Sequence, residues 1–455
     1  MPNWTSKILP RPFEGKGPRR IQGIQVRRRL ANTHWIPDLA GMTDSAPASI
    51  SPPSWDILII GGGVVGSAIA YFLAAAEGER LGPGGGGGSG RPLRIAVVER
   101  DPTYERSSTA LSVGGIRQQF STPENILLSR FTAQFVRRAP ELLAVDGERP
   151  DLGFVEAGYL FLATEAGAPI LHRNHALQRE LGAEVAILSP EELQEAFPWM
   201  EVGDLAAGSL GLQGEGWLDP HSLLQAFRRR ARALGVAFLA DEVVGMRARN
   251  HRVESVTLAS AGTFPVGMVV NAAGPRAEEV ARMAGIRDLP VRPRKRFVYR
   301  IHCREALPGC PLVVDPSGVY FRPEGQDFLC GVSPPPERDE DTLDLSMDYA
   351  LFQDVVWPAL ARRVPAFEAV KLGNSWAGHY AVNTQDRNAI LGPHPELPNF
   401  CLANGFSGHG LQHAPGVGMA LSELILYGEY RSLDLSRFSF ERFASRALIL
   451  EENVV

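Results

Sequence analysis

The stretch DILIIGGGVVGSAIA, residues 56–70, decides the fold of this 455-residue chain. It opens as a short run of bulky apolar residues, which is typical of a strand buried on both faces. Three glycines follow, and a second apolar run then continues to Gly78. As one membrane-spanning helix, the stretch would carry those glycines in its first half, where each costs about 1 kcal/mol relative to alanine. The pattern therefore favours a strand, a tight turn and a helix.

The glycines follow the spacing Gly61-x-Gly63-x-x-Gly66, which indicates dinucleotide binding when it lies between a strand and a helix. The first glycine permits the turn, the second lets a pyrophosphate approach the backbone, and the third lets the helix pack on the strand. The helix that begins near Val64 and Val65 then offers free N–H groups to the phosphates.

The run 93–101 is predicted to form a second buried strand, with Glu99 at the strand's end and Arg100 next to it. A carboxylate at this place can accept both ribose hydroxyls, and it would repel the 2′-phosphate of NADP. Glu99 lies 33 residues beyond Gly66, whereas about 20 is usual. The low-complexity loop 81–92, LGPGGGGGSGRP, accounts for the excess and is predicted to be flexible and exposed.

Further elements follow from local patterns. Residues 219–234 read as a helix capped by Asp219, and residues 268–274 as another buried strand ending in a glycine turn. Period-two alternation in 296–303 and 318–325 predicts half-buried antiparallel strands. Parallel and antiparallel patterns interleave along the chain, so we expect two domains, each built from several pieces.

A second glycine-rich turn lies in residues 403–425, ANGFSGHGLQHAPGVGMALSELI. We expect it to lead into an apolar helix with Pro415 in the first turn. Between the two turns, Ser107, Ser108 and Thr109 are short hydroxyl donors suited to a pyrophosphate, and Arg117 follows a Gly-Gly turn.

Composition is typical of a soluble globular protein, with 44% hydrophobic and 21% charged residues. Residues 1–41 hold eight lysines and arginines against two acidic residues, so the net charge of −5 leaves −11 on the remainder. An acidic body argues against a nucleic-acid partner. The four cysteines show no CxxC pair and no zinc spacing, so we expect reduced thiols and no metal site. The basic residues 1–41 are open to three interpretations: a disordered extension, a mitochondrial presequence, or a segment upstream of a true start at Met42.

Five motifs carry a family resemblance: DILIIGGGVVGSAIA, VVERD, STALSVGGIRQQF, VVNAAGP and GFSGHGLQHAPGVG. In this order they resemble the flavin-dependent amine oxidoreductases of the D-amino-acid oxidase/sarcosine oxidase superfamily. The resemblance implies an α/β fold of the glutathione-reductase type, with a discontinuous Rossmann-like FAD-binding domain and a mixed, largely antiparallel substrate domain. It also implies that the first glycine turn holds the FAD pyrophosphate and the second lies against the flavin.

On this basis we assign pieces of the chain and cofactor-binding residues. The pieces are an extension at 1–53, an FAD-binding domain at 54–114, 201–285 and 381–443, a substrate domain at 115–200 and 286–380, and a tail at 444–455. The cofactor-binding residues are Gly61, Gly63, Val64, Val65, Gly66, Glu99, Arg100, Ser107, Ser108, Thr109, Val243, Ala273, Gly274, Gly405, Gly408, His409, Gly410, Leu411 and Gln412.

Two departures from the family pattern shape the expected chemistry. Sarcosine oxidases link FAD to a cysteine near the position of Gly378, and no cysteine falls there, so we expect non-covalent FAD. Their lysines for the substrate carboxylate and for oxygen are replaced by Gln412 and Leu329. We therefore expect a dehydrogenase rather than a fast oxidase.

The expected reaction is oxidation of the C–N bond of a small secondary or N-methyl amine or amino acid, by hydride transfer to flavin N5. Candidate catalytic residues are Arg117, His409, Tyr320 and Tyr380, and Tyr299 and Arg322 are further candidates for the substrate cavity. The electron acceptor stays open.

A narrower resemblance rests on blocks outside the cofactor motifs, such as EGWLDPHSLLQAFRRR at 215–230. These blocks resemble mitochondrial flavoproteins associated with the assembly of respiratory complex I. The alternative hypothesis is therefore an assembly factor whose partners are complex I components and whose FAD is mainly structural. Two locations stay open: the cytoplasm of a bacterium, including the periphery of the inner membrane, or the mitochondrial matrix.

Overall fold

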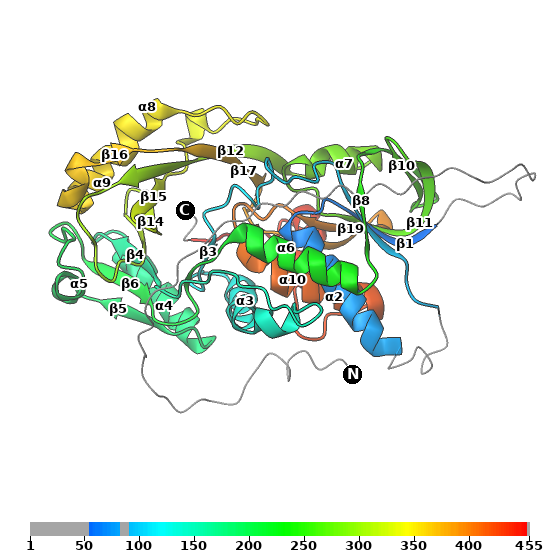
Figure 1. Ribbon diagram of the computed structural model, residues 1–455, viewed down its shortest axis with the longest axis horizontal. Coiled ribbons are helices and arrows are strands. Elements are labelled where there is room, and N and C mark those ends of the chain that lie inside the picture. The colour runs from blue at the N-terminus through cyan, green and yellow to red at the C-terminus, as the bar shows by residue number, and fades with distance from the viewer. Residues whose placement is uncertain (1–53, 82–90, 453–455) are drawn as a thin grey trace, which may run out of the picture.

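The computed structural model describes residues 54–81 and 91–452, and it arranges most of them around two sheets (Figure 1). The predictions for residues 1–53, for the glycine run of the 81–92 loop and for the last three residues lie outside the described residues. Among the helices of the described ranges, none combines the length and the apolar character that crossing a bilayer requires.

The first sheet has the central strand β1 (Trp55–Ile60), which pairs in parallel with β2 and β11. Within the described residues its strand order is β18-β19-β11-β1-β2-β8, and β10 and β9 continue from β11 as antiparallel strands. The other strands are β2 (Ile95–Glu99), β8 (Ala237–Ala240), β9 (Val243–Arg249), β10 (Arg252–Leu258), β11 (Gly262–Asn271), β18 (Ile390–His394) and β19 (Leu397–Asn404).

The central strand is buried on both faces, as its composition predicts. Ile57 and Ile59 belong to one hydrophobic core, which also contains residues of α2, α3, α6 and α10. Leu58 and Ile60 belong to another, with residues of α7, β9 and β10. The helices named here are α2 (Val64–Leu81), α3 (Pro123–Leu142), α6 (Pro220–Ala233), α7 (Ala277–Met283) and α10 (Gly410–Tyr427). Asp219 caps α6 by accepting hydrogen bonds from the backbone N–H groups of His221 and Ser222.

The second sheet is mixed, with the order β16-β12-β15-β14-β13-β4-β6-β5 and β17 beside β12. Only β13 and β4 pair in parallel among these described strands. The strands are β4 (Tyr159–Ala163), β5 (Val185–Leu188), β6 (Ala207–Gly211), β12 (Val291–His302), β13 (Leu312–Val314), β14 (Tyr320–Glu324), β15 (Asp327–Gly331), β16 (Lys371–Leu372) and β17 (Trp376–Asn383). A separate two-stranded pair joins β3 (Gly115–Ile116) to β7 (Gly216–Trp217).

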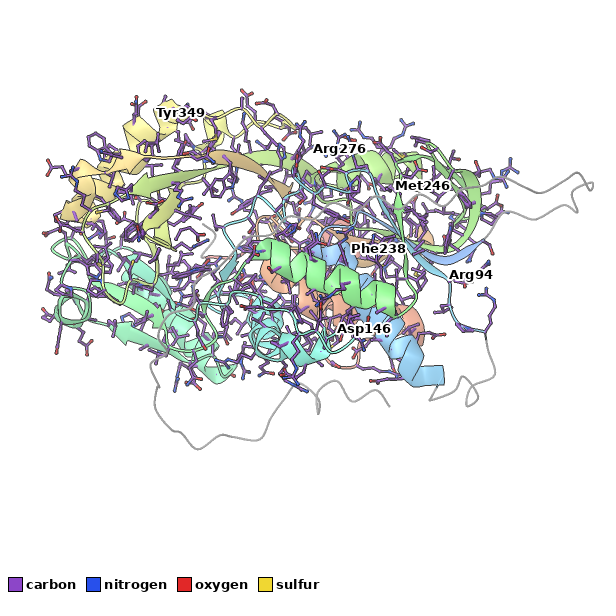
Figure 2. All side chains as sticks on the ribbon, in the orientation of Figure 1. Arg94, Asp146, Phe238, Met246, Arg276 and Tyr349 are labelled. Atoms are coloured by element: carbon purple, nitrogen blue, oxygen red, sulfur yellow. The ribbon has the colours of Figure 1, made fainter. Side chains whose placement is uncertain are left out.

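Short helices cover the outer face of the second sheet. Side chains from this layer and from β12 and β14 share one core, and Tyr349 of α8 is exposed on its outer side (Figure 2). The remaining elements are α4 (Ala168–Glu180), α5 (Pro190–Ala196), α8 (Tyr349–Leu351), α9 (Trp357–Arg363), α11 (Glu441–Ala444), η1 (Gly274–Arg276), η2 (Pro336–Arg338), η3 (Phe352–Val356), η4 (Pro365–Ala369) and η5 (Ser436–Phe438).

The predicted α/β class is confirmed, and three other predictions need correction. The helix after the second glycine turn begins at Gly410, so Pro415 lies inside it and not in its first turn. Strand β6 pairs with β4 and β5, so it belongs to the second sheet although 201–285 was assigned to the FAD-binding domain. Helix α3 packs on α10 in the core of the first sheet, although 115–200 was assigned to the substrate domain. Such pairings join distant segments, which local patterns do not reveal.

Candidate cofactor and substrate cavity

A cavity of about 460 Å³ lies between the two sheets. The β1–α2 turn, the end of β2, the segment after it, the end of β11 and the start of α10 form one part of its wall. Strands β4, β12, β13, β14 and β17 of the second sheet also line it, together with β3 and η1. The carboxyl ends of parallel strands thus face a mixed sheet across the cavity, which is the usual place for a ligand in an open α/β fold.

Each of the three glycines of the first turn is favoured at its position for a different physical reason. Gly61 has φ +100°, and a Cβ there would lie 2.4 Å from the carbonyl oxygen of Ala272. A Cβ on Gly66 would lie 2.0 Å from the carbonyl oxygen of Gly61. A Cβ on Gly63 would meet only Thr109 Oγ1, at 3.4 Å, and Gly63 lines the cavity. Gly61 and Gly66 therefore serve the fold, whereas Gly63 keeps space open for a ligand.

Glu99 lies at the end of β2 and lines the cavity, as predicted from the strand position. Its Oε2 accepts a hydrogen bond from Gly62 N at 2.8 Å, and its Oε1 accepts one from Asp101 N at 2.8 Å. Burial raises the pKa of this carboxyl, and the two backbone N–H groups act in the opposite direction. Each carboxylate oxygen retains acceptor capacity toward the cavity, since it has two lone-pair directions.

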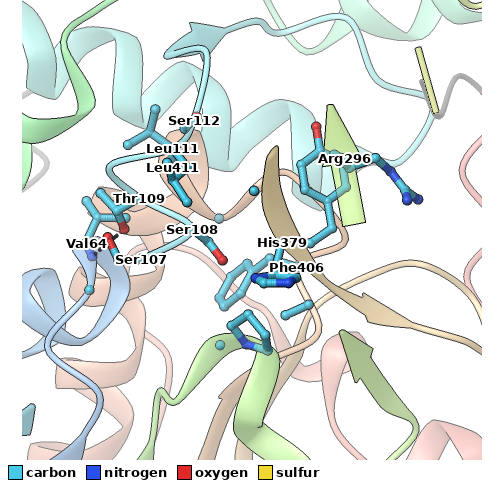
Figure 3. A pocket seen from close by; sticks show the side chains of 18 of the residues that line it. Val64, Ser107, Ser108, Thr109, Leu111, Ser112, Arg296, His379, Phe406 and Leu411 are labelled. Atoms are coloured by element: carbon cyan, nitrogen blue, oxygen red, sulfur yellow. Dashed lines mark hydrogen bonds between the residues drawn. The ribbon is translucent and has the colours of Figure 1, made fainter. Parts of the chain in front are cut away.

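The hydroxyl cluster after β2 lies against the start of α2 (Figure 3). Thr109 Oγ1 accepts a hydrogen bond from Val64 N at 3.1 Å. Ser108 Oγ is buried and has no hydrogen-bond partner among the described residues, and Ser108 lines the cavity. Because a buried hydroxyl without a partner is costly, this atom indicates that a polar ligand completes the site.

The second glycine turn places the N-terminus of α10 at the cavity. Gly408, His409, Gly410, Leu411 and Gln412 all line it. His409 is the N-cap residue, and no side-chain hydrogen bond caps the helix. The first N–H groups of α10 are therefore left to a ligand, and their partial positive charge favours negative charge nearby.

Arg117 joins the segment after β2 to this helix. Its backbone N–H donates to Gln412 Oε1 at 2.8 Å, and its Nη2 lies 3.0 Å from His409 Nε2. The guanidinium carbon lies 4.4 Å from the ring centre of Phe120 and 5.1 Å from that of Phe161. Burial lowers the pKa of Arg117, but an arginine keeps its charge at neutral pH. Burial, and then the charge of Arg117, lower the pKa of His409 well below its usual value.

Three tyrosines line the same cavity: Tyr159, Tyr320 and Tyr380. Burial raises the pKa of both Tyr159 and Tyr320, so these phenols stay protonated and can donate hydrogen bonds. Arg296 also lines the cavity, but two contacts of 2.6 and 3.2 Å already pair it with Asp339. Arg117 is buried and lines the same cavity as the three tyrosines, so its charge can attract a substrate anion there.

The structure brings most of the predicted residues to this cavity. Those that line it are Gly61, Gly63, Val64, Val65, Glu99, Arg100, Ser107, Ser108, Thr109, Arg117, Ala273, Gly274, Tyr320, Tyr380, Gly408, His409, Gly410, Leu411 and Gln412. Gly378 lines it as well.

Five predicted residues lie elsewhere. Gly66 and Gly405 make close contacts within the protein, and Val243 is buried in the core between β9 and α7. Tyr299 points into the outer core of the second sheet and donates to the carbonyl of Asp348. Arg322 is buried and donates from Nε to the carbonyl of Val113 at 3.0 Å. At these positions the sequence pattern predicts a buried residue or a turn residue. It does not predict whether the side chain faces the cavity or the protein core.

Several cavity residues were missed by the sequence analysis, above all Tyr159 and Arg296. Tyr159 belongs to YLFLA, where every side chain is buried, so no alternation marks the one that faces the cavity. Gly62, which does not line the cavity, has a structural role that the sequence does not reveal: a Cβ there would lie 2.6 Å from Tyr104 Oη. A buried Tyr104 with φ +62° closes the back of the first turn, and no local signal predicts that contact.

The residues present fit a flavin dinucleotide. An open glycine at a helix N-terminus, an acidic residue at the end of the next strand, an unsatisfied serine hydroxyl and a second helix N-terminus follow one another along one cavity. Together with the parallel sheet and its mixed partner sheet, they define a dinucleotide-binding oxidoreductase fold. The family model described as FAD dependent oxidoreductase matches residues 56–424, and the chain belongs to this family.

Individual relatives agree with this assignment. FAD-dependent oxidoreductase domain-containing protein 1 of Xenopus laevis is 44% identical over 465 residues, which covers 95% of this chain and 91% of that protein. Mitochondrial sarcosine dehydrogenase of Mus musculus is 28% identical over 96% of this chain, but the match spans only 46% of that longer protein. The crystal structure of L-proline dehydrogenase from P. horikoshii superposes with a TM-score of 0.76 at 27% identity, and covers 88% of this chain and 100% of its own.

Proposed function

We propose that this protein is a dehydrogenase that uses non-covalently bound FAD to oxidise the C–N bond of a small secondary or N-methyl amino acid. The observation that carries the proposal is the placement of buried Arg117 among Tyr159, Tyr320 and Tyr380 at one cavity. A cation and phenolic donors at one place suit a carboxylate, because hydrogen bonds to a charged group are about twice as strong as neutral ones.

FAD would be held along the glycine turns. Gly63 and the N–H groups of Val64 and Val65 would receive the pyrophosphate, Glu99 the adenosine ribose, and the N-terminus of α10 the flavin. When bound, FAD supplies a hydride acceptor at N5. None of the cysteines Cys303, Cys310, Cys330 and Cys401 lines the cavity, which supports non-covalent binding.

The protein groups would bind and orient the substrate rather than remove a proton from carbon. Arg117 would hold the carboxylate, while the tyrosine hydroxyls donate to it or to the amine. His409 accepts from Arg117 and stays neutral, so it adds no second cation that would repel a protonated amine. An amine reaching this cavity in its neutral form would carry the lone pair that assists hydride departure. No strong protein base is then required.

Two relatives support the substrate class through their printed names. One is a sarcosine dehydrogenase and the other an L-proline dehydrogenase, and both sarcosine and proline are secondary amines that carry a carboxylate. Gln412, where the sarcosine oxidases of the resemblance have a lysine, lines the cavity and accepts from Arg117 N. The carboxylate would therefore depend on Arg117 more strongly than in those enzymes.

The alternative proposal is an assembly factor for respiratory complex I in which FAD is mainly structural. It is favoured by the higher identity, 41–44%, to three vertebrate proteins named FAD-dependent oxidoreductase domain-containing protein 1. That printed name states an oxidoreductase domain and no substrate. Partners would then be complex I components, and matrix localisation would follow.

Anaerobic titration of the yellow holoprotein with a panel of amines tests the first proposal. We expect sarcosine, N-methyl amino acids or proline to bleach the flavin, and an artificial dye to reoxidise it faster than oxygen does. The proposal fails if no secondary or N-methyl amine bleaches the flavin. Lowered amounts of assembled NADH dehydrogenase after deletion of the gene would then support the alternative.

A further inference from the structure

The C-terminal segment 447–452 packs against the loop before α3 and against the Asp386–Asn388 turn. Ile449 is buried in the core of the first sheet. Its N–H donates to Asp386 Oδ2 at 3.2 Å, and its carbonyl accepts from Asn388 Nδ2 at 2.8 Å. Asp386 is itself buried and paired with Arg442 at 2.7 Å. The segment is thus bound to buried polar groups.

Glu451 connects this segment to the loop before α3. Its Oε1 accepts from both the backbone N–H and the Oγ of Ser121, the latter at 2.6 Å. Its Oε2 accepts from Asn125 Nδ2 at 3.0 Å. Ser121 Oγ in turn accepts from Glu452 N at 2.8 Å. One carboxylate therefore joins two parts of the chain that lie 330 residues apart.

Ser121 ends the segment 115–121, which carries Arg117. After the two residues of β3, three backbone N–H groups of this segment donate to side chains from other parts of the protein. Arg117 N donates to Gln412, Gln118 N to buried Glu215 at 2.5 Å, and Ser121 N to Glu451. The segment holds its shape through these acceptors because it has no long strand partner.

Phe120, next to Ser121 in the chain, packs against two groups that line the cavity. Its ring lies 4.4 Å from the guanidinium carbon of Arg117 and packs edge-on against His409, with the centroids 5.0 Å apart. A shift of Ser121 would therefore move the ring that supports both groups. The negative charge of Glu451 also opposes the lowering of the Arg117 pKa by burial.

We propose that Glu451 is a positioning residue that holds the Arg117 guanidinium at the cavity through Ser121 and Phe120. The inference rests on the proposed function, in which Arg117 binds the substrate carboxylate. It makes the C-terminal segment a part of the site and not only a terminus packed on the surface.

The test compares Glu451→Ala with Glu452→Ala in the full-length holoprotein. Glu452 is a matched control. Among the described residues its side chain makes one ion pair, an exposed one with Arg173, while its backbone N–H still donates to Ser121. In Glu451→Ala we expect amide hydrogen exchange in residues 115–125 to become about tenfold faster, because loss of the carboxylate makes local opening of this segment easier. FAD content should stay normal because Glu451 does not line the cavity.

The second measurement is flavin reduction by the amine that bleaches the wild type. We expect the half-saturating amine concentration to rise about tenfold in Glu451→Ala, the fold-change of one lost hydrogen bond to a charged group. The limiting rate should change less. Glu451→Gln keeps an acceptor for Ser121 and should recover most of both effects, so it also replaces Glu451→Ala if that variant folds poorly.

Equal exchange rates in residues 115–125 for Glu451→Ala, Glu452→Ala and wild type would overturn the proposal. So would unchanged amine saturation despite faster exchange. If no amine reduces even the wild-type flavin, the proposed function fails. The exchange experiment then still decides whether Glu451 holds the Arg117 segment.

Discussion

The Nη2 atom of Arg117 lies 3.0 Å from the Nε2 atom of His409, although 292 residues separate them. An arginine can only donate, so His409 accepts through Nε2 and carries its proton on Nδ1. A second proton would place two cations in contact inside the protein. The pKa of His409 is lowered accordingly, by burial first and by Arg117 second. The cavity therefore has one positive charge at this point and not two.

His413, one turn further along α10, gives a pH prediction. Burial and the charge of Arg117 lower its pKa to about 3, whereas the pKa of a histidine in an unfolded chain is about 6.5. As the pH falls below about 6.5, the unfolded chain binds a proton at His413 before the folded chain does. The free energy of unfolding therefore decreases from its value at pH 7 as the pH approaches 3. Between pH 7 and pH 5 the loss is about 2 kcal/mol for this one group.

We expect His413→Gln to remove that part of the pH dependence. Denaturant unfolding of the holoprotein at pH 7 and pH 5 measures it as a smaller difference in the free energy of unfolding than wild type shows. His172→Gln, at an exposed position on α4, is the control and should keep the wild-type difference. Identical pH dependence in His413→Gln and wild type would contradict the prediction.

Gly63→Val should abolish FAD binding while the protein still folds. A side chain there enters the cavity, and its Cβ makes only an ordinary contact with Thr109. The flavin absorbance of the purified protein and its circular dichroism measure the two parts of this expectation. Gly78→Ala, in helix α2, which begins directly after Gly63, is the control because nothing lies within 4 Å of the new Cβ. It should retain FAD and gain up to about 1 kcal/mol of stability. Full flavin content in Gly63→Val would contradict the assignment of this turn to pyrophosphate binding.

The first turn shows how far local patterns reach. Glu99, Gly63 and the start of α2 could be predicted because strand, turn and helix follow one another in sequence. The second turn was predicted for the same reason. The sequence predicts too late a start for α10, because a proline favours the first turn of a helix, whereas Gly410 already begins this one.

Contacts between distant segments account for what the sequence analysis missed. Tyr159 reaches the cavity because β4 pairs with β6 and β13, and Glu451 reaches Ser121 across nearly the whole chain. Val243 follows strand β8, which pairs with β2, but its side chain lies in the core that also contains α7 and not at the cavity. The direction of a side chain depends on strand register, and a change of one residue in register reverses it.

Acid precipitation of the holoprotein should release free FAD into the supernatant. The reason is the distribution of thiols: Cys303, Cys310, Cys330 and Cys401 are buried, and none lines the cavity. Gly378, at the position where the resemblance expects a linking cysteine, does line it. Absorbance of the supernatant and of the dissolved pellet measures the partition. Flavin that stays in the pellet after digestion to peptides would show a covalent bond and contradict this expectation.

Arg117→Ala should slow flavin reduction by a carboxylate-bearing amine at least about 100-fold, the scale of losing one electrostatic stabiliser. FAD content should remain near normal, because the groups assigned to the pyrophosphate, Gly63, Val64 and Val65, belong to a different part of the cavity wall, the β1–α2 turn. The decisive comparison is between a substrate and the same amine without its carboxylate. If Arg117 binds the carboxylate, the substitution penalises the first far more than the second, and Arg117→Lys recovers part of the difference. Equal penalties for both amines would instead assign Arg117 to the flavin itself.

If Arg117→Ala fully restores assembled NADH dehydrogenase in cells that lack the gene, amine oxidation at this site is not needed for assembly. The protein's role there would then depend on its folded, FAD-loaded form alone.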